Sequence, residues 1–370
     1  MPRLPTSLVL QAYRENPLLP ILLKECRTLQ YARNELRWLR ESAIARCGLQ
    51  KRPFTLNRGH DSSIWRRKLK QMCAHRGKGK PLQYILGNQP FGDLEILCEK
   101  GVLIPRTETE LYTFHTKDLV LKGLRVGEFE RNCIHVLDIC SGSGCISLLL
   151  HSLLAPHVEH LTIIGVDISP QAINLAVRNK KHNLSRGILT SRAGRDVIFE
   201  QFDILDNQKG HIPPLVDNLK NILATRRSAN TDSDSCRSTW DVLISNPPYI
   251  SPSNMIDGTT SRSVRKYEPI QALVPPPGNP LACEWSGLGA ICQEDTFYPH
   301  LLLLALKLDV KLVVLECGDA AQAQRVVKMA RAIFIISETA ERRVSVDIYN
   351  ESEMANDYDG GARAVVVKTF

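Results

Sequence analysis

The chain has 370 residues, of which 43% are hydrophobic and 23% charged, and it carries a net charge of +8. This length suggests two domains, and the apolar content is sufficient for a real core. The longest apolar runs, such as LLLLAL at 301–306, are far shorter than the roughly 20 residues of a membrane-spanning helix, so no membrane span is predicted. The eleven cysteines include no C-x-x-C pair, which argues against a metal site.

The N-terminal part of the chain has helical periodicity. Apolar residues recur at helical spacing across 17–45 and again across 62–75, which predicts two amphipathic helices followed by a third. We therefore expect residues 1–80 to form a small all-α domain. The first fourteen residues contain two arginines and no acid, a composition compatible with a mitochondrial presequence.

A different pattern begins at Pro81. Residues 81–105 alternate short apolar runs with glycines and are predicted to form a β-hairpin connector. From residue 106 onward, apolar strands at 134–138, 161–167, 197–203, 242–244 and 312–316 alternate with helical segments at 145–154, from 170, at about 290–308 and at 320–332. Strands that alternate with helices indicate a doubly wound parallel sheet. Two last strands, 343–349 and 362–369, are expected to be an antiparallel pair.

Three segments interrupt this alternation. Residues 207–239 are polar and basic and are predicted to be a flexible surface insertion. Residues 251–266 are expected to be a polar loop that covers the site, and 275–287 to be a second irregular segment.

The stretch DVLISNPPYI at 241–250 is the first chemical signal. The proline pair cannot donate to a sheet ladder, so the strand must end there and leave Asn246 at its carboxyl end, where open α/β sheets bind ligands. The Asn246 side-chain oxygen and the Pro247 carbonyl offer two acceptors for one planar NH2 group, and Tyr249 offers an aromatic face. A purely structural proline turn with a buried tyrosine would have the same sequence, so this motif alone does not identify a ligand site.

A second signal follows the strand at 134–138. Gly142 and Gly144 open a helix, which allows close backbone approach to a ligand. Position 147 is serine, so the third glycine of a dinucleotide-binding loop is missing and NAD or FAD is disfavoured. Asp138, Asp167 and Asp203 all emerge at the same edge of the predicted sheet. Strand-end aspartates are also common helix caps, but three of them beside a glycine loop describe a nucleoside site without pyrophosphate.

Together, these motifs resemble class I S-adenosylmethionine-dependent methyltransferases that act on planar nitrogen. The segments PLQYILG at 81–87 and VLIPRTETE at 102–110 narrow the resemblance to the HemK/PrmC family, the N(5)-glutamine methyltransferases of peptide release factors, and to its fungal mitochondrial branch. The resemblance covers nearly the whole chain. It implies a Rossmann-like, mostly parallel seven-stranded sheet with an antiparallel C-terminal hairpin, and it gives the helical domain a role in substrate recognition.

The resemblance also implies site residues. Asn246, Pro247 and Tyr249 would be catalytic, and Pro248, Arg106 and Glu108 would join them around the substrate. S-adenosyl-L-methionine would contact Asn246 and a set of strand-end and loop residues, namely Asp138, Cys140, Ser141, Gly142, Ser143, Gly144, Asp167, Ile168, Asp203 and Ile204. Cys140 and Ser141 replace the Gly-Thr of many members, a departure that we expect to be tolerated because Gly142 and Gly144 remain.

The expected reaction is methylation of the glutamine amide in the Gly-Gly-Gln motif of a class I peptide chain release factor. The expected location is the mitochondrial matrix, with the cytoplasm as second choice, and a monomer without membrane or direct nucleic-acid contact is expected. Three alternatives stay open. They are an adenine-amine methyltransferase of DNA or RNA that uses the same Asn-Pro-Pro-Tyr, a methyltransferase of a different protein glutamine, and a non-catalytic ribosome-associated factor.

Overall fold

The structure is a computed structural model that describes residues 3–48, 58–129, 133–205, 216–217, 219, 221–222, 239–277, 291–336, 343–350 and 363–369. Nearly all of the predicted insertion at 207–239, and residues 278–287 of the second irregular segment, lie outside these ranges. No helix within them is both long and apolar enough to cross a bilayer. The chain divides into two compact units, the first comprising 1–89, 98–100 and 260–268 and the second comprising 90–97, 101–259 and 269–370.

The first unit is helical, as its periodicity predicts. It contains α1 (Thr6–Glu15), α2 (Leu19–Cys26), α3 (Leu29–Arg46), α4 (Arg58–Gly77) and the short α5 (Leu82–Leu86). Leucines of α2 and α3 pack with Met72 and Cys73 of α4 in one apolar cluster. A partly buried ion pair between Arg76 and Glu35, with N–O distances of 2.8 and 3.0 Å, connects α4 to α3.

Two segments predicted to lack helices contain short ones. Residues 82–86 form helix α5, because Pro81 precedes a compact apolar turn that ends on Gly87 in a left-handed conformation (φ 87°). The predicted hairpin begins only afterwards, as β1 (Asn88–Phe91) and β2 (Leu94–Leu97). The predicted loop at 251–266 contains α11 (Pro252–Ile256) and α12 (Arg262–Tyr267), since Ser251 and Ser261 each cap a short helix.

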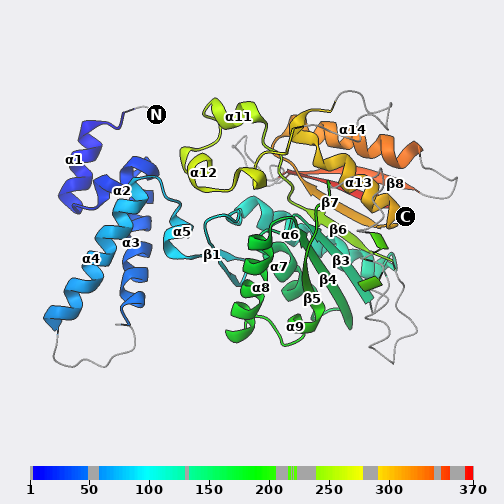
Figure 1. Ribbon diagram of the computed structural model, residues 1–370, viewed down its shortest axis with the longest axis horizontal. Helices are drawn as coiled ribbons and strands as arrows, with labels where there is room; N and C mark the ends of the chain where they lie inside the picture. Colours follow the sequence, from blue (N-terminus) through cyan, green and yellow to red (C-terminus); the bar gives the residue numbers. More distant parts are fainter. Residues whose placement is uncertain are drawn as a thin grey trace. The chain divides into compact units, whose positions relative to one another are not determined.

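The second unit is an α/β domain around one seven-stranded sheet (Figure 1). The strands are β3 (Cys133–Ile139), β4 (His160–Asp167), β5 (Val197–Gln201), β6 (Val242–Ser245), β7 (Leu312–Glu316), β8 (Val344–Asn350) and β9 (Arg363–Thr369). Their order across the sheet is β5-β4-β3-β6-β7-β9-β8. Neighbours from β5 to β7 are parallel, whereas β9 pairs antiparallel with both β7 and β8. The predicted class, including the antiparallel C-terminal pair, is confirmed.

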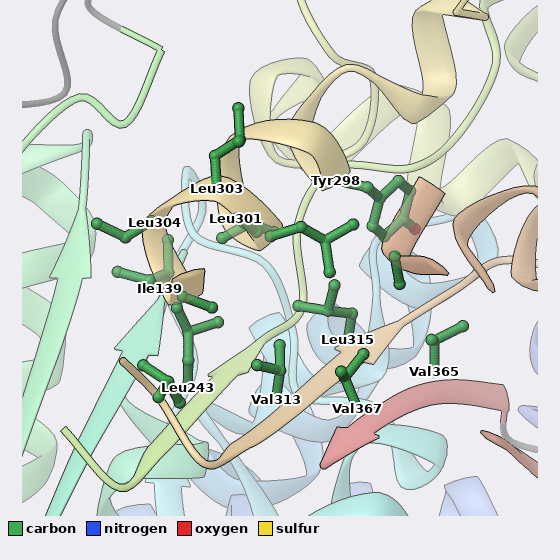
Figure 2. Packing of buried hydrophobic residues seen from close by; sticks show 14 of the residues in the cluster. Ile139, Leu243, Tyr298, Leu301, Leu303, Leu304, Val313, Leu315, Val365 and Val367 are labelled. Atoms are coloured by element: carbon green, nitrogen blue, oxygen red, sulfur yellow. The ribbon is translucent and has the colours of Figure 1, made fainter. Parts of the chain in front are cut away.

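Helices cover both faces of this sheet. On one face lie α6 (Thr107–Val126), α7 (Cys145–Leu154) and α8 (Pro170–Ser185), whose side chains share an apolar cluster with Val136, Val242 and Val314. The opposite face packs against α13 (Phe297–Lys307) and α14 (Ala320–Ile336). Figure 2 shows Ile139, Leu243, Val313, Leu315, Val365 and Val367 directed from the strands toward Tyr298 and the leucines of α13. The shorter α9 (Ala193–Asp196), η1 (Ile270–Ala272) and η3 (Gln293–Asp295) complete the described elements.

Candidate active site

The strand order creates one switch point, between β3 and β6. From β3 the chain moves outward through β4 to β5, and then returns to place β6 on the other side of β3. Ile139 pairs with Ser245, and Ser245 with Leu315, so the chain leaves β3, β6 and β7 at the same level. Ligands of open α/β sheets bind at this type of position.

The loop after β3 has a left-handed backbone conformation at every second residue. Cys140, Gly142 and Gly144 have φ values of 61°, 53° and 77°. A Cβ added to Gly144 would lie 2.7 Å from the Phe199 ring, whereas one added to Gly142 would meet no atom within 4 Å. Gly144 is therefore needed for packing, and Gly142 borders open space in which a ligand can approach the backbone.

Asp138 lies inside β3 and is fully buried. Its Oδ2 accepts hydrogen bonds from the amide and the hydroxyl of Ser147 at 3.1 and 2.5 Å. Its Oδ1 has no partner within the described part of the chain. Burial raises the pKa of this carboxyl to about 7, although the bonds from Ser147 oppose the shift. An unpartnered buried oxygen beside a glycine loop is a ready acceptor for a ligand.

Asp167 ends β4 and holds the glycine loop in place. Its two oxygens accept from the amides of Gly142 at 2.8 Å and Ser169 at 2.9 Å. Burial raises its pKa above the ordinary value. The neighbouring Ile168 is 53% exposed, which places an apolar side chain at the rim beside this carboxylate.

Asp203 lies two residues beyond the end of β5, so the predicted strand to 203 was too long. The strand ends at Gln201 because its neighbour β4 ends at Asp167, and the Phe202 amide makes the last bond between them, to the Asp167 carbonyl at 3.0 Å. Asp203 Oδ1 accepts from the Leu205 amide at 2.9 Å. Ile204 is half-buried and packs against the cluster under α13.

The Asn-Pro-Pro-Tyr segment follows β6 directly. Asn246 Nδ2 donates to Thr109 Oγ1 at 3.1 Å, and both prolines are buried. The Tyr249 hydroxyl donates to Glu316 Oε1 at 3.1 Å, while the Gln322 side-chain amide donates to the Tyr249 carbonyl at 3.3 Å. The tyrosine is thus held at both ends.

Glu316 is the centre of this half of the site. It ends β7, is 3% exposed and accepts from Thr109 Oγ1 through Oε2 at 2.8 Å. Burial raises the pKa of Glu316 to about 7, while the hydroxyls of Tyr112, Thr109 and Tyr249 favour its ionised form. The carboxylate therefore organises hydroxyl groups from α6 and from the segment after β6.

Arg106 and Glu108 lie at the start of α6. Both act electrostatically on the Tyr249 hydroxyl. Burial and the nearby Glu316 raise the pKa of this hydroxyl. Arg106 lowers this pKa and Glu108 raises it. The structure therefore brings Arg106 and Glu108 near Tyr249 of the Asn-Pro-Pro-Tyr segment, and it adds Thr109 and Glu316 to the same place.

Comparison with known proteins identifies the family. Residues 131–209 match the model of the methyltransferase domain. A probable mitochondrial N(5)-glutamine methyltransferase of MRF1 from Schizosaccharomyces pombe is 34% identical over 275 residues, which cover 74% of this chain and 73% of that protein. The chain belongs to this family of N(5)-glutamine methyltransferases.

Two further relatives of this glutamine methyltransferase agree with the assignment. The mitochondrial MRF1 N(5)-glutamine methyltransferase of Saccharomyces cerevisiae is 34% identical, covering 74% of this chain and 68% of that protein. The release factor glutamine methyltransferase of Geobacter sulfurreducens is 30% identical, covering 66% of this chain and 67% of that protein.

The glutamine methyltransferase uses S-adenosyl-L-methionine, and the residues present fit this cofactor. The unpartnered Asp138 Oδ1, the open space at Gly142 and the exposed Ile168 beside Asp167 provide acceptors for hydroxyl and ammonium groups and an apolar surface. No pyrophosphate is needed to satisfy them.

Sequence reasoning assigned no role to Thr109 and Glu316. Both lay inside segments that it singled out, Thr109 in the 102–110 stretch and Glu316 at the end of a predicted strand. The rule that drew attention to Asp167, a carboxylate at the end of a buried parallel strand, applies equally to Glu316. A carboxylate at this edge of the sheet is therefore predictable from the sequence.

Proposed function

We propose that this protein transfers a methyl group from S-adenosyl-L-methionine to the side-chain amide nitrogen of a glutamine, namely that of the Gly-Gly-Gln motif of a class I peptide chain release factor. One observation carries the proposal. Asn246 and Pro247 directly follow β6 at the switch point, and a hydrogen bond to Thr109 fixes the Asn246 amide. The relatives' names supply the substrate class.

When bound, the cofactor supplies an electrophilic methyl group on sulfonium. The amide nitrogen of glutamine is a poor nucleophile because its lone pair is delocalised into the carbonyl. The Asn246 Oδ1 and the Pro247 carbonyl each accept a hydrogen bond from one N–H group of this amide, which fixes the plane of the amide. Pro247 has no N–H of its own to compete. Positioning and electrostatic stabilisation of positive charge on nitrogen provide most of the rate. No strong base is required before transfer, since the methylated nitrogen is very acidic.

The other site residues divide into two groups. One group holds the cofactor. It consists of Asp138, the loop Cys140–Gly144 with Ser141, Gly142 and Ser143, and the pairs Asp167–Ile168 and Asp203–Ile204. Tyr249 and Pro248 pack beside the glutamine amide, and Arg106 and Glu108 line the approach to it. The electrostatic coupling of these last two residues to Tyr249 supports their placement.

We further propose that the protein acts as a monomer in the mitochondrial matrix, with the cytoplasm as the alternative. The names of the two fungal relatives support the mitochondrion. The proposed partner is a release factor, without a membrane or direct nucleic-acid contact.

The first experiment measures transfer of label from S-adenosylmethionine to three substrates. They are a purified mitochondrial class I release factor, the same factor with the glutamine of its Gly-Gly-Gln motif changed to alanine, and duplex or single-stranded DNA. We expect label on the intact factor alone. Label on DNA alone would replace the proposal by adenine methylation, and label on both forms of the factor would place the target outside the motif.

Asn246→Ala tests the catalytic assignment. Because it removes an acceptor that aligns the amide, we expect turnover to fall about 100-fold or more, while the affinity for S-adenosylmethionine measured by calorimetry changes little. Asn174→Ala, at an exposed position of α8, is the matched control and should retain wild-type turnover. Near-normal turnover of Asn246→Ala would remove Asn246 from the mechanism.

A further inference from the structure

A chain of hydrogen bonds connects three separate segments behind Asn246. Asn246 Nδ2 donates to Thr109 Oγ1 at 3.1 Å, and Thr109 Oγ1 donates to Glu316 Oε2 at 2.8 Å. The second oxygen of the same carboxylate accepts from the Tyr249 hydroxyl at 3.1 Å. Thr109 is 2% exposed and Glu316 3% exposed, so solvent does not replace these bonds.

The chemistry of the three groups decides which end of the Asn246 amide faces Thr109. In its ionised form, which the bonds from Thr109 and Tyr249 favour, the Glu316 carboxylate only accepts hydrogen bonds, so the single hydroxyl hydrogen of Thr109 is committed to it. Thr109 Oγ1 then has lone pairs to offer and no hydrogen. It can accept from the NH2 end of Asn246, and it cannot donate to the carbonyl end. The Asn246 Oδ1 is consequently left to accept from another donor.

We propose that Thr109 and Glu316 are positioning residues that hold Asn246 with its carbonyl oxygen toward the substrate amide, an inference that rests on the proposed function. Without them, the Asn246 amide can turn by 180° about its terminal bond. It would then present two N–H donors to the N–H donors of the glutamine, and the productive arrangement would be lost. Glu316 also holds Tyr249, so one carboxylate orders both ends of the Asn-Pro-Pro-Tyr segment.

The test uses substitutions in the full-length protein that each remove one hydrogen-bonding group from this series of hydrogen bonds. Thr109→Val keeps the shape and removes the hydroxyl, whereas Thr109→Ser keeps the hydroxyl. Glu316→Gln replaces one acceptor oxygen by an NH2 group, so Thr109 or Tyr249 loses its acceptor. We expect kcat for the release factor to fall about 10- to 100-fold in Thr109→Val and Glu316→Gln. KM should stay within about three-fold, because ground-state binding is little changed, and Thr109→Ser should recover most of the wild-type kcat.

The double variant separates positioning from general damage. Residues that act as one unit are strongly non-additive, so Thr109→Val with Glu316→Gln should reduce kcat about as much as the more severe single change. If the double variant instead lost kcat by the product of the two single losses, the proposal that Thr109 and Glu316 act together would be overturned. If Glu316→Gln fails to fold, Thr109→Val and Thr109→Ser still decide the question, since equal turnover of both variants with wild type would also overturn it.

A second readout requires neither cofactor nor substrate. In protein labelled with [15N]asparagine, the Asn246 side-chain NH2 signal is assigned by its loss in Asn246→Ala. We expect its hydrogen exchange to accelerate at least ten-fold in Thr109→Val and to stay near wild type in Thr109→Ser; unchanged exchange in Thr109→Val would overturn the inference. A wild-type protein that labels no release factor would refute the proposed function, whereas wild-type labelling with unaffected Thr109→Val would refute this inference alone.

Discussion

Gly318, two residues beyond β7, sets the position of the Tyr249 ring. A Cβ added to Gly318 would lie 2.9 Å from Tyr249 Cδ2 and 3.2 Å from Gln322 Oε1. Favourable carbon–carbon contacts begin at about 3.5 Å, so the ring would have to move by roughly 0.6 Å or more. It cannot move freely, because its hydroxyl is bonded to Glu316 and the Tyr249 carbonyl to Gln322.

We therefore expect Gly318→Ala to reduce kcat about 10- to 100-fold, since displacements approaching 1 Å in a catalytic site have effects of this size. This corresponds to about 1.4–2.7 kcal/mol in the activation barrier. Overpacking should also lower the free energy of unfolding by about 1–3 kcal/mol. Initial rates of release factor methylation and urea unfolding measure the two effects separately.

Gly194→Ala is the matched control. Gly194 lies in α9, and its added Cβ would meet no atom within 4 Å, so turnover should be unchanged and stability equal or up to about 1 kcal/mol higher. The reasoning about Tyr249 would be refuted if Gly318→Ala turned over within about two-fold of wild type.

Two further predictions concern the cofactor half of the site. Gly142→Ala and Gly187→Ala both place a side chain at positive φ in open space, so each should lower the free energy of unfolding by about 1–2 kcal/mol. Only Gly142→Ala should weaken S-adenosylmethionine binding in calorimetry. Equal affinities of the two variants would mean that the space at Gly142 is not the cofactor site. Burial raises the pKa of Asp138 to about 7 in the folded state. The folded protein therefore binds this proton more tightly than the unfolded chain, and the group's contribution to stability declines as pH rises toward 7. In urea unfolding without cofactor, Asp138→Asn should abolish about 2 kcal/mol of the stability loss between pH 5 and pH 7, and an unchanged pH profile would contradict the assignment.

The fold was predictable where local sequence carries the physical cause. Strands β3, β4 and β7 are mostly buried on both faces, so they are mainly apolar runs, and the Ser169-Pro170 cap marked the start of α8. Helices α5, α11 and α12 were missed because five or six residues are too few to show a 3.6-residue period.

The site was predictable in part for a related reason. Asn246, Asp167 and the glycine loop each stand at the end of a recognisable strand, so topology alone brings them to one edge. The bond between Thr109 and Glu316 joins residues 207 positions apart. Only the register of β6 against β7, in which Ser245 pairs with Leu315, shows that Glu316 lies level with Asn246. A carboxylate at the end of β7 is visible in the sequence, but its bond to Thr109 is not.

The strand order also implies a sequence of events during synthesis. Strands β3, β4 and β5, together with Asp138, Asp167 and Asp203, come from residues 133–205, whereas β6 lies between β3 and a strand that ends at residue 316. A growing chain can thus pair its first three parallel strands long before Asn246 gains its second neighbour. Because a ligand that binds only ordered chain stabilises it by mass action, we expect S-adenosylmethionine to stabilise early assembly. The half of the site proposed to hold the methyl donor is therefore synthesised first. The segment after β6, proposed to hold the acceptor amide, joins a half that is already paired.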